Sequence, residues 1–356
     1  MRGWVCVASI AACAACALDP GVGAAYAPDP SWAVVDAAGG GDYTTVQAAI
    51  DAHIAPGEGG WRRILVRDGM YTERIEVPAT SSKLLLEGES RAGVRLELDE
   101  CYVAQGGVLR AHSVVRVWAE DVVIRSLTVT NLADEPGGCG GAWDHAVRTE
   151  SDRVVLDDVT LRADHDTLIT KGARNRVFVT NSHIQGRGDF VTSFTSLFVE
   201  TSRVETIRFP SHLLFQDGAT PGPDRQETLV VRDSSFAGLI DKAGVTRMYG
   251  NAHLYLIGNT FEDGLGADRP VVHYYEQHQP AESKVWRYGN SSTGPDPLIW
   301  DRYSYEGPTG RIEQPVGSAA PYAHVLELDE AARVQPDACF WGWDARATLT
   351  EARGTP

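Results

Sequence analysis

One short pattern recurs six times in the middle of the chain and constrains the fold more than any other feature. Each copy has two or three apolar residues, a polar corner and an alternating apolar end. The copies are VVIRSLTV (122–129), VVLDDVTL (154–161), VFVTNSHI (177–184), LFVETSRV (197–204), LVVRDSSF (229–236) and LYLIGNTF (254–261). Their starts are separated by 32, 23, 20, 32 and 25 residues.

Each copy predicts two short strands that meet at a bend, because apolar and polar residues alternate on both sides of the corner. A unit of this size cannot bury its apolar face alone. Stacking the units in a coil of roughly 20 to 30 residues per turn closes one continuous core. The sequence therefore predicts an all-β solenoid, a parallel β-helix, with loops in the longer intervals.

One stretch near the N-terminal end departs from this strand pattern. Residues Thr44–Asp51 begin with threonines and place apolar side chains at 46, 49 and 50, which predicts a short amphipathic helix capping the first coil. The preceding AAGGGD run, Ala37–Asp42, lacks the G-K-[ST] ending of a phosphate loop. We therefore expect no nucleotide site there.

Charge and cysteine content limit the partners and cofactors. The 356 residues carry a formal net charge of −16, without a long single-sign run, which argues against nucleic acid or an anionic membrane as partner. Outside the first residues the chain has only Cys101, Cys139 and Cys339, and none has metal-ligand spacing. We expect no metal or organic cofactor. One disulfide is permitted, with Cys101 and Cys139 the nearest pair in sequence.

The first residues have the layout of an export signal. One arginine precedes a run of small apolar side chains that is too short to span a bilayer, so we assign residues 1–27 to targeting. Within this segment, Ile10–Cys13 resembles a bacterial lipobox, in which Cys13 would carry a lipid. Ordinary cleavage near Ala17 or Ala27 is an equally open alternative.

Two aspartates lie one turn of the predicted coil apart. Asp166 follows a histidine in HDTL, and Asp189 lies between glycine and phenylalanine in GRGDF, 23 residues later. Adjacent strands are about 4.8 Å apart, so the two carboxylates can be neighbours on one face. If that face is partly buried, one of them holds a proton near neutral pH, which provides an acid beside a nucleophile or base.

Several motifs, in order, resemble the pectin methylesterase family. Residues 33–349 carry the resemblance in GGGDYTTVQAAIDA, in Gly69, Tyr71 and Glu73 of a G-x-Y-x-E pattern, and in HAVRT, HDTL, GRGDFVTS, VTRMY and the closing segment 324–349. The resemblance implies a right-handed parallel β-helix with a short N-terminal capping helix and a C-terminal tail packed on the coil. It also implies an ester hydrolase that needs no cofactor.

The resemblance assigns roles residue by residue. Asp189 would be the nucleophile, Asp166 the acid and then the base, and Arg247 the group that orients Asp189. The two glutamines that stabilise the oxyanion in the family are replaced here by His145 and His165, whose N–H groups can also donate to an oxyanion. Such donors would introduce a new pH dependence.

Other departures from the family concern the substrate. Thr192 and Ser193 replace Phe-Gly, and Met248 and Tyr249 replace Pro-Trp, so the aromatic walls of a sugar groove are reduced. We expect the substrate-binding residues to be Phe190, Thr192 and Tyr249. The aromatic-rich segment 271–286 either lines such a groove or closes the last coils.

The predicted organisation is a targeting segment (1–27), a single β-helix esterase-like domain (28–349) and a C-terminal tail (350–356). We expect an exported monomer, either secreted, periplasmic or an outer-membrane lipoprotein, that demethylates esterified galacturonan, a pectin-like polysaccharide, with two aspartates. Alternatives are an ester or thioester hydrolase with another substrate, a catalytically silent glycan-binding β-helix, and, more remotely, a lyase or glycosidase. No G-x-S-x-G motif supports serine chemistry.

Overall fold

The computed structural model describes residues 32–354 with gaps. The gaps are 55–58, 80–82, 100–102, 106–107, 111–112, 134–143, 173, 208–211, 219–227, 239–243, 251–252, 263–270, 275–283, 295–299, 301, 308–309 and 316–323. Targeting residues 1–27, with Cys13, and the cysteines Cys101 and Cys139 lie outside the described residues.

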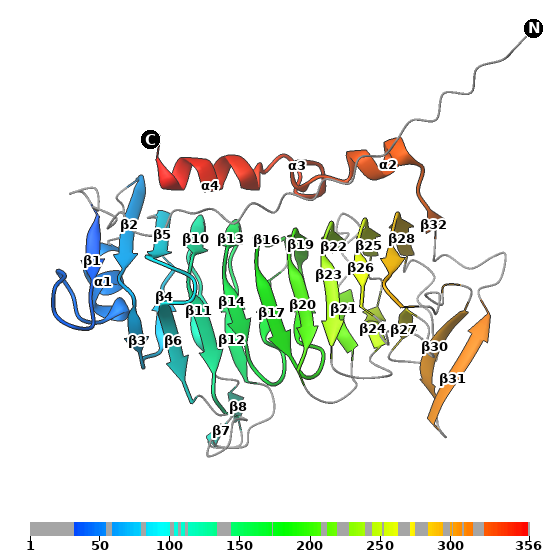
Figure 1. Ribbon diagram of the computed structural model, residues 1–356, viewed down its shortest axis with the longest axis horizontal. Helices are drawn as coiled ribbons and strands as arrows, with labels where there is room; N and C mark the ends of the chain where they lie inside the picture. The colour runs from blue at the N-terminus through cyan, green and yellow to red at the C-terminus, as the bar shows by residue number, and fades with distance from the viewer. Residues whose placement is uncertain are drawn as a thin grey trace, which may run out of the picture.

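Three long sheets, which we call A, B and C, wrap around a common core (Figure 1). Their neighbouring strands are parallel, except for the β30–β31 pair at the end of sheet C. A separate antiparallel hairpin is formed by β7 (Val103–Gln105) and β8 (Val108–Arg110).

The strands of each sheet follow one another along the coil. Sheet A contains β1 (Ala33–Val35), β2 (Trp61–Val66), β5 (Lys83–Gly88), β10 (Val122–Arg125), β13 (Val154–Asp157), β16 (Arg176–Thr180), β19 (Ser196–Glu200), β22 (Thr228–Arg232), β25 (His253–Ile257), β28 (Lys284–Tyr288) and β32 (His324–Val325). Sheet B contains β3 (Gly69–Tyr71), β6 (Val94–Leu98), β11 (Thr128–Asn131), β14 (Thr160–Arg162), β17 (His183–Gly186), β20 (Arg203–Thr206), β23 (Ser235–Gly238), β26 (Thr260–Phe261) and β29 (Ser291–Ser292). Sheet C contains β4 (Ile75–Val77), β9 (Ser113–Val117), β12 (His145–Thr149), β15 (Leu168–Thr170), β18 (Val191–Ser193), β21 (His212–Gly218), β24 (Gly244–Gly250), β27 (Val272–Tyr274), β30 (Arg302–Gly307) and β31 (Gly310–Pro315).

The six sequence copies are the steps of this coil. In each copy the first half is a strand of sheet A and the second half is a strand of sheet B. The copies align in register from turn to turn, so that Val122 pairs with Val154 and Val154 with Val177. The predicted parallel β-helix, with two strands meeting at a polar corner in every copy, is confirmed.

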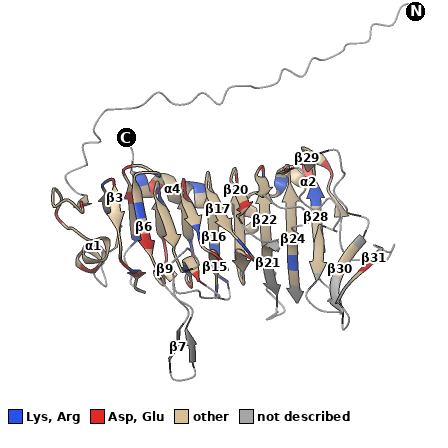
Figure 2. Cartoon of the chain, turned by 60° about the horizontal axis from the view of Figure 1, so that its bottom comes forward, with Lys and Arg blue, Asp and Glu red and all other residues tan. Residues whose placement is uncertain are grey.

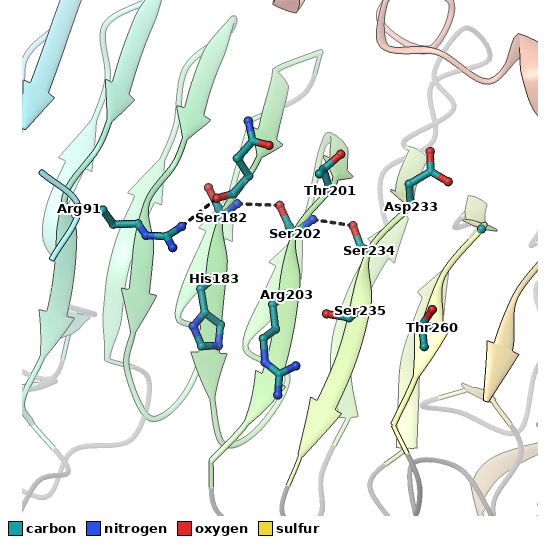
Figure 3. Close-up of a pocket in the computed structure, with 12 residues that line it drawn as sticks. Arg91, Ser182, His183, Thr201, Ser202, Arg203, Asp233, Ser234, Ser235 and Thr260 are labelled. Carbon is teal, nitrogen blue, oxygen red and sulfur yellow. Dashed lines mark hydrogen bonds between the residues drawn. The ribbon is translucent and has the colours of Figure 1, made fainter. Parts of the chain in front are cut away.

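The backbone conformation explains why the corner of each copy is polar. In the first five copies one non-glycine residue adopts a positive φ, for example Asp158 at 53° and Asp233 at 47°, and Gly258 takes this place in the sixth. Asparagine, aspartate and glycine tolerate this conformation best. The next residue points inward and bonds along the coil: the N–H of Ser182 donates to Ser202 Oγ at 3.1 Å, and this contact repeats in the next turn (Figure 3).

The N-terminal end of the core is capped as predicted. Helix α1 (Val46–His53) begins after Thr45, whose hydroxyl accepts the N–H of Ala48. Its apolar residues Val46, Ala49 and Ile50 are buried in the core. The Glu73 carboxylate of the G-x-Y-x-E pattern accepts N–H groups at the start of the helix, at 2.8 and 3.0 Å. A carboxylate here is stabilised by the helix dipole.

The C-terminal segment packs along the outer face of sheet A (Figure 1). This confirms the predicted packing of a C-terminal tail on the coil. It contains α2 (Leu328–Arg333), α3 (Pro336–Cys339) and α4 (Ala345–Arg353). Phe340 and Trp343 join a second apolar cluster with the outward side chains of sheet A, including Phe178 and Phe198. The boundary expected after residue 349 falls inside α4.

The aromatic-rich segment 271–286 closes the last coils where it is described. Val271, Val272 and Val285 belong to the core, and the Trp286 ring stacks on Tyr255 with centroids 4.3 Å apart. Cys339 has a free thiol whose pKa is raised to about 12 by burial. Of the helices described, none has the length and apolar character that crossing a membrane requires.

Candidate active site

The coil brings Asp166 and Asp189 to equivalent positions in consecutive turns. Leu168 pairs with Val191, and His165 forms a bridge with Gly188, so the 23-residue spacing holds on both sides of the aspartates. Each aspartate turns the chain from sheet B into sheet C, with a φ of 51° in Asp166 and 46° in Asp189. The spacing in the sequence predicted this neighbourhood.

Asp189 is held by an arginine from a strand two positions further along sheet C. Nη1 of Arg247, on β24, lies 2.5 Å from Oδ2 of Asp189. Burial raises the pKa of Asp189, and the charge and hydrogen bond of Arg247 oppose that rise. The Asp166 carboxylate raises the pKa of Asp189 further. Arg247 therefore favours the ionised form of this one carboxylate.

Asp166 has a different partner. The Thr192 hydroxyl donates to Oδ1 of Asp166 at 2.5 Å, and it also contacts the main-chain oxygen of Asp189. Burial raises the pKa of Asp166, opposed first by the bond from Thr192 and then by the charges of Lys171 and Arg247. Because the guanidinium of Arg247 bonds to Asp189, Asp189 ionises more readily and Asp166 is better placed to keep a proton.

One of the two histidines lies in the turn before Asp166, and the other lies in the same turn as Asp166. The register that joins Val147 to Leu168 places His145 beside Asp166, and Nδ1 of the buried His145 lies 3.0 Å from Ser113 Oγ. His165 directly precedes Asp166, and burial lowers the pKa of its imidazole even though Asp189 raises it. The lowered pKa favours a neutral His165 ring with one N–H donor.

The expected substrate-binding residues divide into three cases. Phe190 is fully buried in the core, so it supports the site from within; the expectation that it contacts substrate is wrong, because its side chain points into the coil. Thr192 is 2% exposed and bonds to the aspartates, so its hydroxyl is committed to positioning them. Tyr249 lies on β24, but its side chain is outside the described residues.

Sequence reasoning missed a group of charged side chains on the same face. Arg116 lies on β9, Arg148 on β12 together with His145, and Lys171 directly after β15. The Glu150 carboxylate lies among them. The signal was available: aligning HAVRTE with DTLITK at the register of the aspartates places Glu150 next to Lys171.

A hollow of about 450 Å³ lies away from the aspartates. It follows the corner between sheets A and B and the outer face of sheet B, where Arg91, His183 and Arg203 project from its walls (Figure 3). Each of the three side chains already has a partner: Arg91 pairs with Asp158, His183 contacts Glu205, and Arg203 pairs with Glu205 and Glu262. No predicted site residue lines this hollow.

The arrangement around the aspartates suits acyl transfer. An arginine-held carboxylate provides a nucleophile, and a neighbouring carboxyl with a raised pKa provides a proton. Among the described residues, no group of three or more histidine, cysteine, aspartate or glutamate side chains is arranged to hold a metal ion. The fold and this site together define a class: β-helix proteins with a pair of carboxyl groups on sheet C.

Comparison with known proteins narrows this class. Residues 32–211 match the pectinesterase family model, which covers half of the chain, and the chain belongs to the pectinesterase family. A probable pectinesterase of Arabidopsis thaliana is 28% identical over 169 residues, which are 46% of each chain. A pectinesterase of Daucus carota is 25% identical over 215 residues, 58% of this chain and 63% of the relative. The chain spans about half the length of the first curated relatives it matches.

Solved structures confirm the predicted right-handed parallel β-helix. The pectin methylesterase from carrot has a TM-score of 0.72 and 17% identity, covering 92% of this chain and 98% of that one. Pectin methylesterase PemA from Erwinia chrysanthemi has a TM-score of 0.68 and 16% identity, covering 90% of this chain and 99% of that one. A pectin methylesterase solved with a hexasaccharide has a TM-score of 0.63 and 17% identity, covering 88% of this chain and 98% of that one.

Proposed function

We propose that this protein is a carboxylic ester hydrolase that removes methyl groups from esterified galacturonan. The observation that carries the proposal is the pairing of Asp189 with Arg247 at 2.5 Å beside a second, half-buried carboxyl, Asp166, one turn away. Membership of the pectinesterase family supports the same chemistry.

In the first step, a carboxylate oxygen of Asp189 attacks the ester carbonyl carbon. The bond from that carbon to the methoxy oxygen then breaks, and the Asp166 proton passes to the leaving oxygen, which departs as methanol. The product is an anhydride between Asp189 and the sugar carboxyl group. Arg247 keeps Asp189 ionised for attack and orients it.

In the second step, the ionised Asp166 takes a proton from water. The resulting hydroxide adds to the anhydride carbonyl, the bond to Asp189 breaks, and both aspartates return to their starting forms. His145 and His165 are the proposed donors to the oxyanion formed in each step, where the family has glutamines. Tyr249 is the proposed contact for the sugar.

The test is methanol release from highly methylated pectin by residues 28–356, scanned from about pH 5 to pH 9. The Asp189→Asn variant preserves the shape of the side chain, and Arg333→Gln changes an exposed helix residue as a control. We expect release by the wild type and the control only. Release by the Asp189→Asn variant at the wild-type rate would refute the assignment, and no release by any protein would favour another ester or a silent glycan binder.

We also propose that the chain is exported by residues 1–27 and acts as a monomer. The basic residue and apolar run of the first segment support export, and Cys13 is the proposed lipid attachment point. Mass spectrometry of the mature N-terminus tests this: a lipid on Cys13 supports anchoring, whereas cleavage near Ala17 or Ala27 leaves a free secreted protein. Light scattering of the mature protein tests the monomer.

A further inference from the structure

Asp144 is a buried carboxylate next to the site that the proposed mechanism does not use. It directly precedes His145, the first residue of β12, and its side chain has no exposed surface. Burying a charge costs free energy unless the charge is paired or hydrogen-bonded. The groups that hold this carboxylate therefore indicate its role.

The partners of Asp144 lie in the turn that carries His165 and Asp166. Oδ2 of Asp144 accepts the main-chain N–H of Asp164 at 3.2 Å, and Oδ1 accepts that of His165 at 3.3 Å. Both oxygens accept donors, as those of an ionised carboxylate do. Burial raises the pKa of Asp144, and its hydrogen bonds to the main chain and the charge of His165 oppose the rise. The carboxylate thus links two consecutive turns directly before Asp166.

This link lies just before the regular backbone contacts between the two turns. Further along, the N–H groups of Ala146 and Val147 both donate to the main-chain oxygen of Thr167 at 3.0 Å, and β12 then pairs with β15. Asp166 leaves regular strand geometry with a φ of 51°, a conformation that few residues adopt without support. The Asp144 side chain holds the chain on one side of Asp166, and Thr167 holds it on the other.

The following turn bonds to the same segment independently of Asp144. The N–H of Arg187 donates to the main-chain oxygen of Asp164 at 2.7 Å, and the guanidinium of Arg187 pairs with the Asp164 carboxylate. The N–H of Leu168 donates to the main-chain oxygen of Phe190 at 2.9 Å. Loss of the Asp144 carboxylate would therefore release one side of the segment while the coil stays assembled.

We propose that Asp144 is a positioning residue, whose carboxylate holds the turn that presents His165, the proposed oxyanion donor, and Asp166, the proposed proton donor, to the ester. This inference rests on the proposed function. An N–H must point at the developing oxyanion and a proton donor at the leaving oxygen. A small displacement of this turn therefore slows the chemical step more than it weakens substrate binding.

The charge of Asp144 also acts on the His165 ring. It raises the pKa of His165, as Asp189 does, whereas burial and the charges of Arg187 and Arg247 lower that pKa. Removing the charge of Asp144 should therefore lower the pKa of His165 further. This shift reports on the contact whether or not the protein releases methanol.

The first test compares the methanol release of Asp144→Asn and Asp157→Asn from highly methylated pectin. Asp157 is also a buried aspartate, but it bonds to Arg125 on sheet A, so its variant is the matched control for stability. Asp144→Asn keeps the shape of the side chain and loses the charge and one acceptor. Its kcat should fall by about 10- to 100-fold, with KM within about threefold of wild type. The kcat of the control should stay within about twofold of wild type.

NMR titration of the His165 imidazole in the same proteins is the second test. The pKa of His165 should fall in Asp144→Asn and keep its wild-type value in Asp157→Asn. A wild-type kcat in Asp144→Asn would overturn the inference whether or not this pKa moves, and so would an equal loss of kcat in both variants. A lowered His165 pKa without methanol release by the wild type would overturn the proposed function and leave the contact between Asp144 and this turn standing.

A measurement on the wild type covers the case in which Asp144→Asn does not fold. The amide hydrogens of Asp164 and His165 should exchange with solvent as slowly as that of Ala146, which is bonded to the main-chain oxygen of Thr167. Rapid exchange at either amide would overturn the inference.

Discussion

The outer faces of sheets A and C use the same coil geometry for opposite purposes. Along sheet A the outward positions are apolar, and the C-terminal helices cover them; Phe178 and Phe198 have no exposed surface. Along sheet C the outward positions hold Asp189 and Arg247, together with the cations Arg116, Arg148 and Lys171. Figure 2 shows how widely acidic and basic positions are spread over the coil.

The difference teaches how a solenoid separates stability from chemistry. The central turns contribute a strand to each sheet, and the inward side chains of all three sheets build the core. What a face does is then decided by its outward residues alone. Apolar outward side chains are stabilised when another segment covers them. Charged outward side chains next to the buried core include carboxyl groups whose pKa values are raised by burial.

The largest effect that this comparison predicts is on turnover. Asp189→Ala should lower kcat by at least about 10³-fold, because loss of a covalent nucleophile removes the reaction path. Thermal unfolding should stay cooperative, since sheet A and the core are untouched. The measurement is methanol release together with circular dichroism of the same sample. A variant that kept a tenth of wild-type kcat would show that the charged face is not the catalytic one.

The second prediction concerns the other face. Phe198→Ala should cost about 3–5 kcal/mol of unfolding free energy, because the ring is fully buried between Phe178 and Phe340, with centroids 6.1 and 6.2 Å away. Methanol release by the folded fraction should stay within about twofold of wild type. Urea unfolding checks the loss. Trp341→Ala, at a side chain that is 55% exposed, is the control and should cost less than about 0.5 kcal/mol.

The fold could be predicted from the sequence further than the site. The six copies determine the strands, corners and register because each depends on residues close together in the chain. Asp166 and Asp189 were predicted as neighbours for the same reason. The direction of a side chain just after a turn is less local: Phe190 follows a residue with positive φ and points inward, and the sequence alone did not indicate this. The charges around Lys171 emerge only when consecutive turns are aligned.

The third prediction uses the arginine to move a pH profile. Arg247 opposes the rise in the pKa of Asp189, so Arg247→Gln should raise that pKa and shift the acidic limb of kcat/KM to higher pH. The loss should be about 10- to 100-fold at low pH and smaller at high pH, where Asp189 ionises without help. Arg247→Lys should restore part of the profile. An unchanged acidic limb in Arg247→Gln would mean that a different group limits the reaction.

The smallest effect is a gain in stability on the charged face. Burial raises the pKa of Asp166 in the folded protein above its unfolded value, so its contribution to stability is present at low pH and is lost as pH rises through the folded pKa. Near about pH 7.5 the free energy of unfolding of Asp166→Asn should therefore exceed that of wild type by about 0.5–2 kcal/mol, which thermal unfolding would show as a higher unfolding temperature. In acid the two proteins should be equally stable. Partial exposure keeps the gain small, and Thr192 can still donate to the amide oxygen. Turnover should be lost at every pH. A less stable Asp166→Asn protein at neutral pH would mean that this carboxylate supports the fold, and the separation between a stabilising sheet A and a reactive sheet C would not hold at that position.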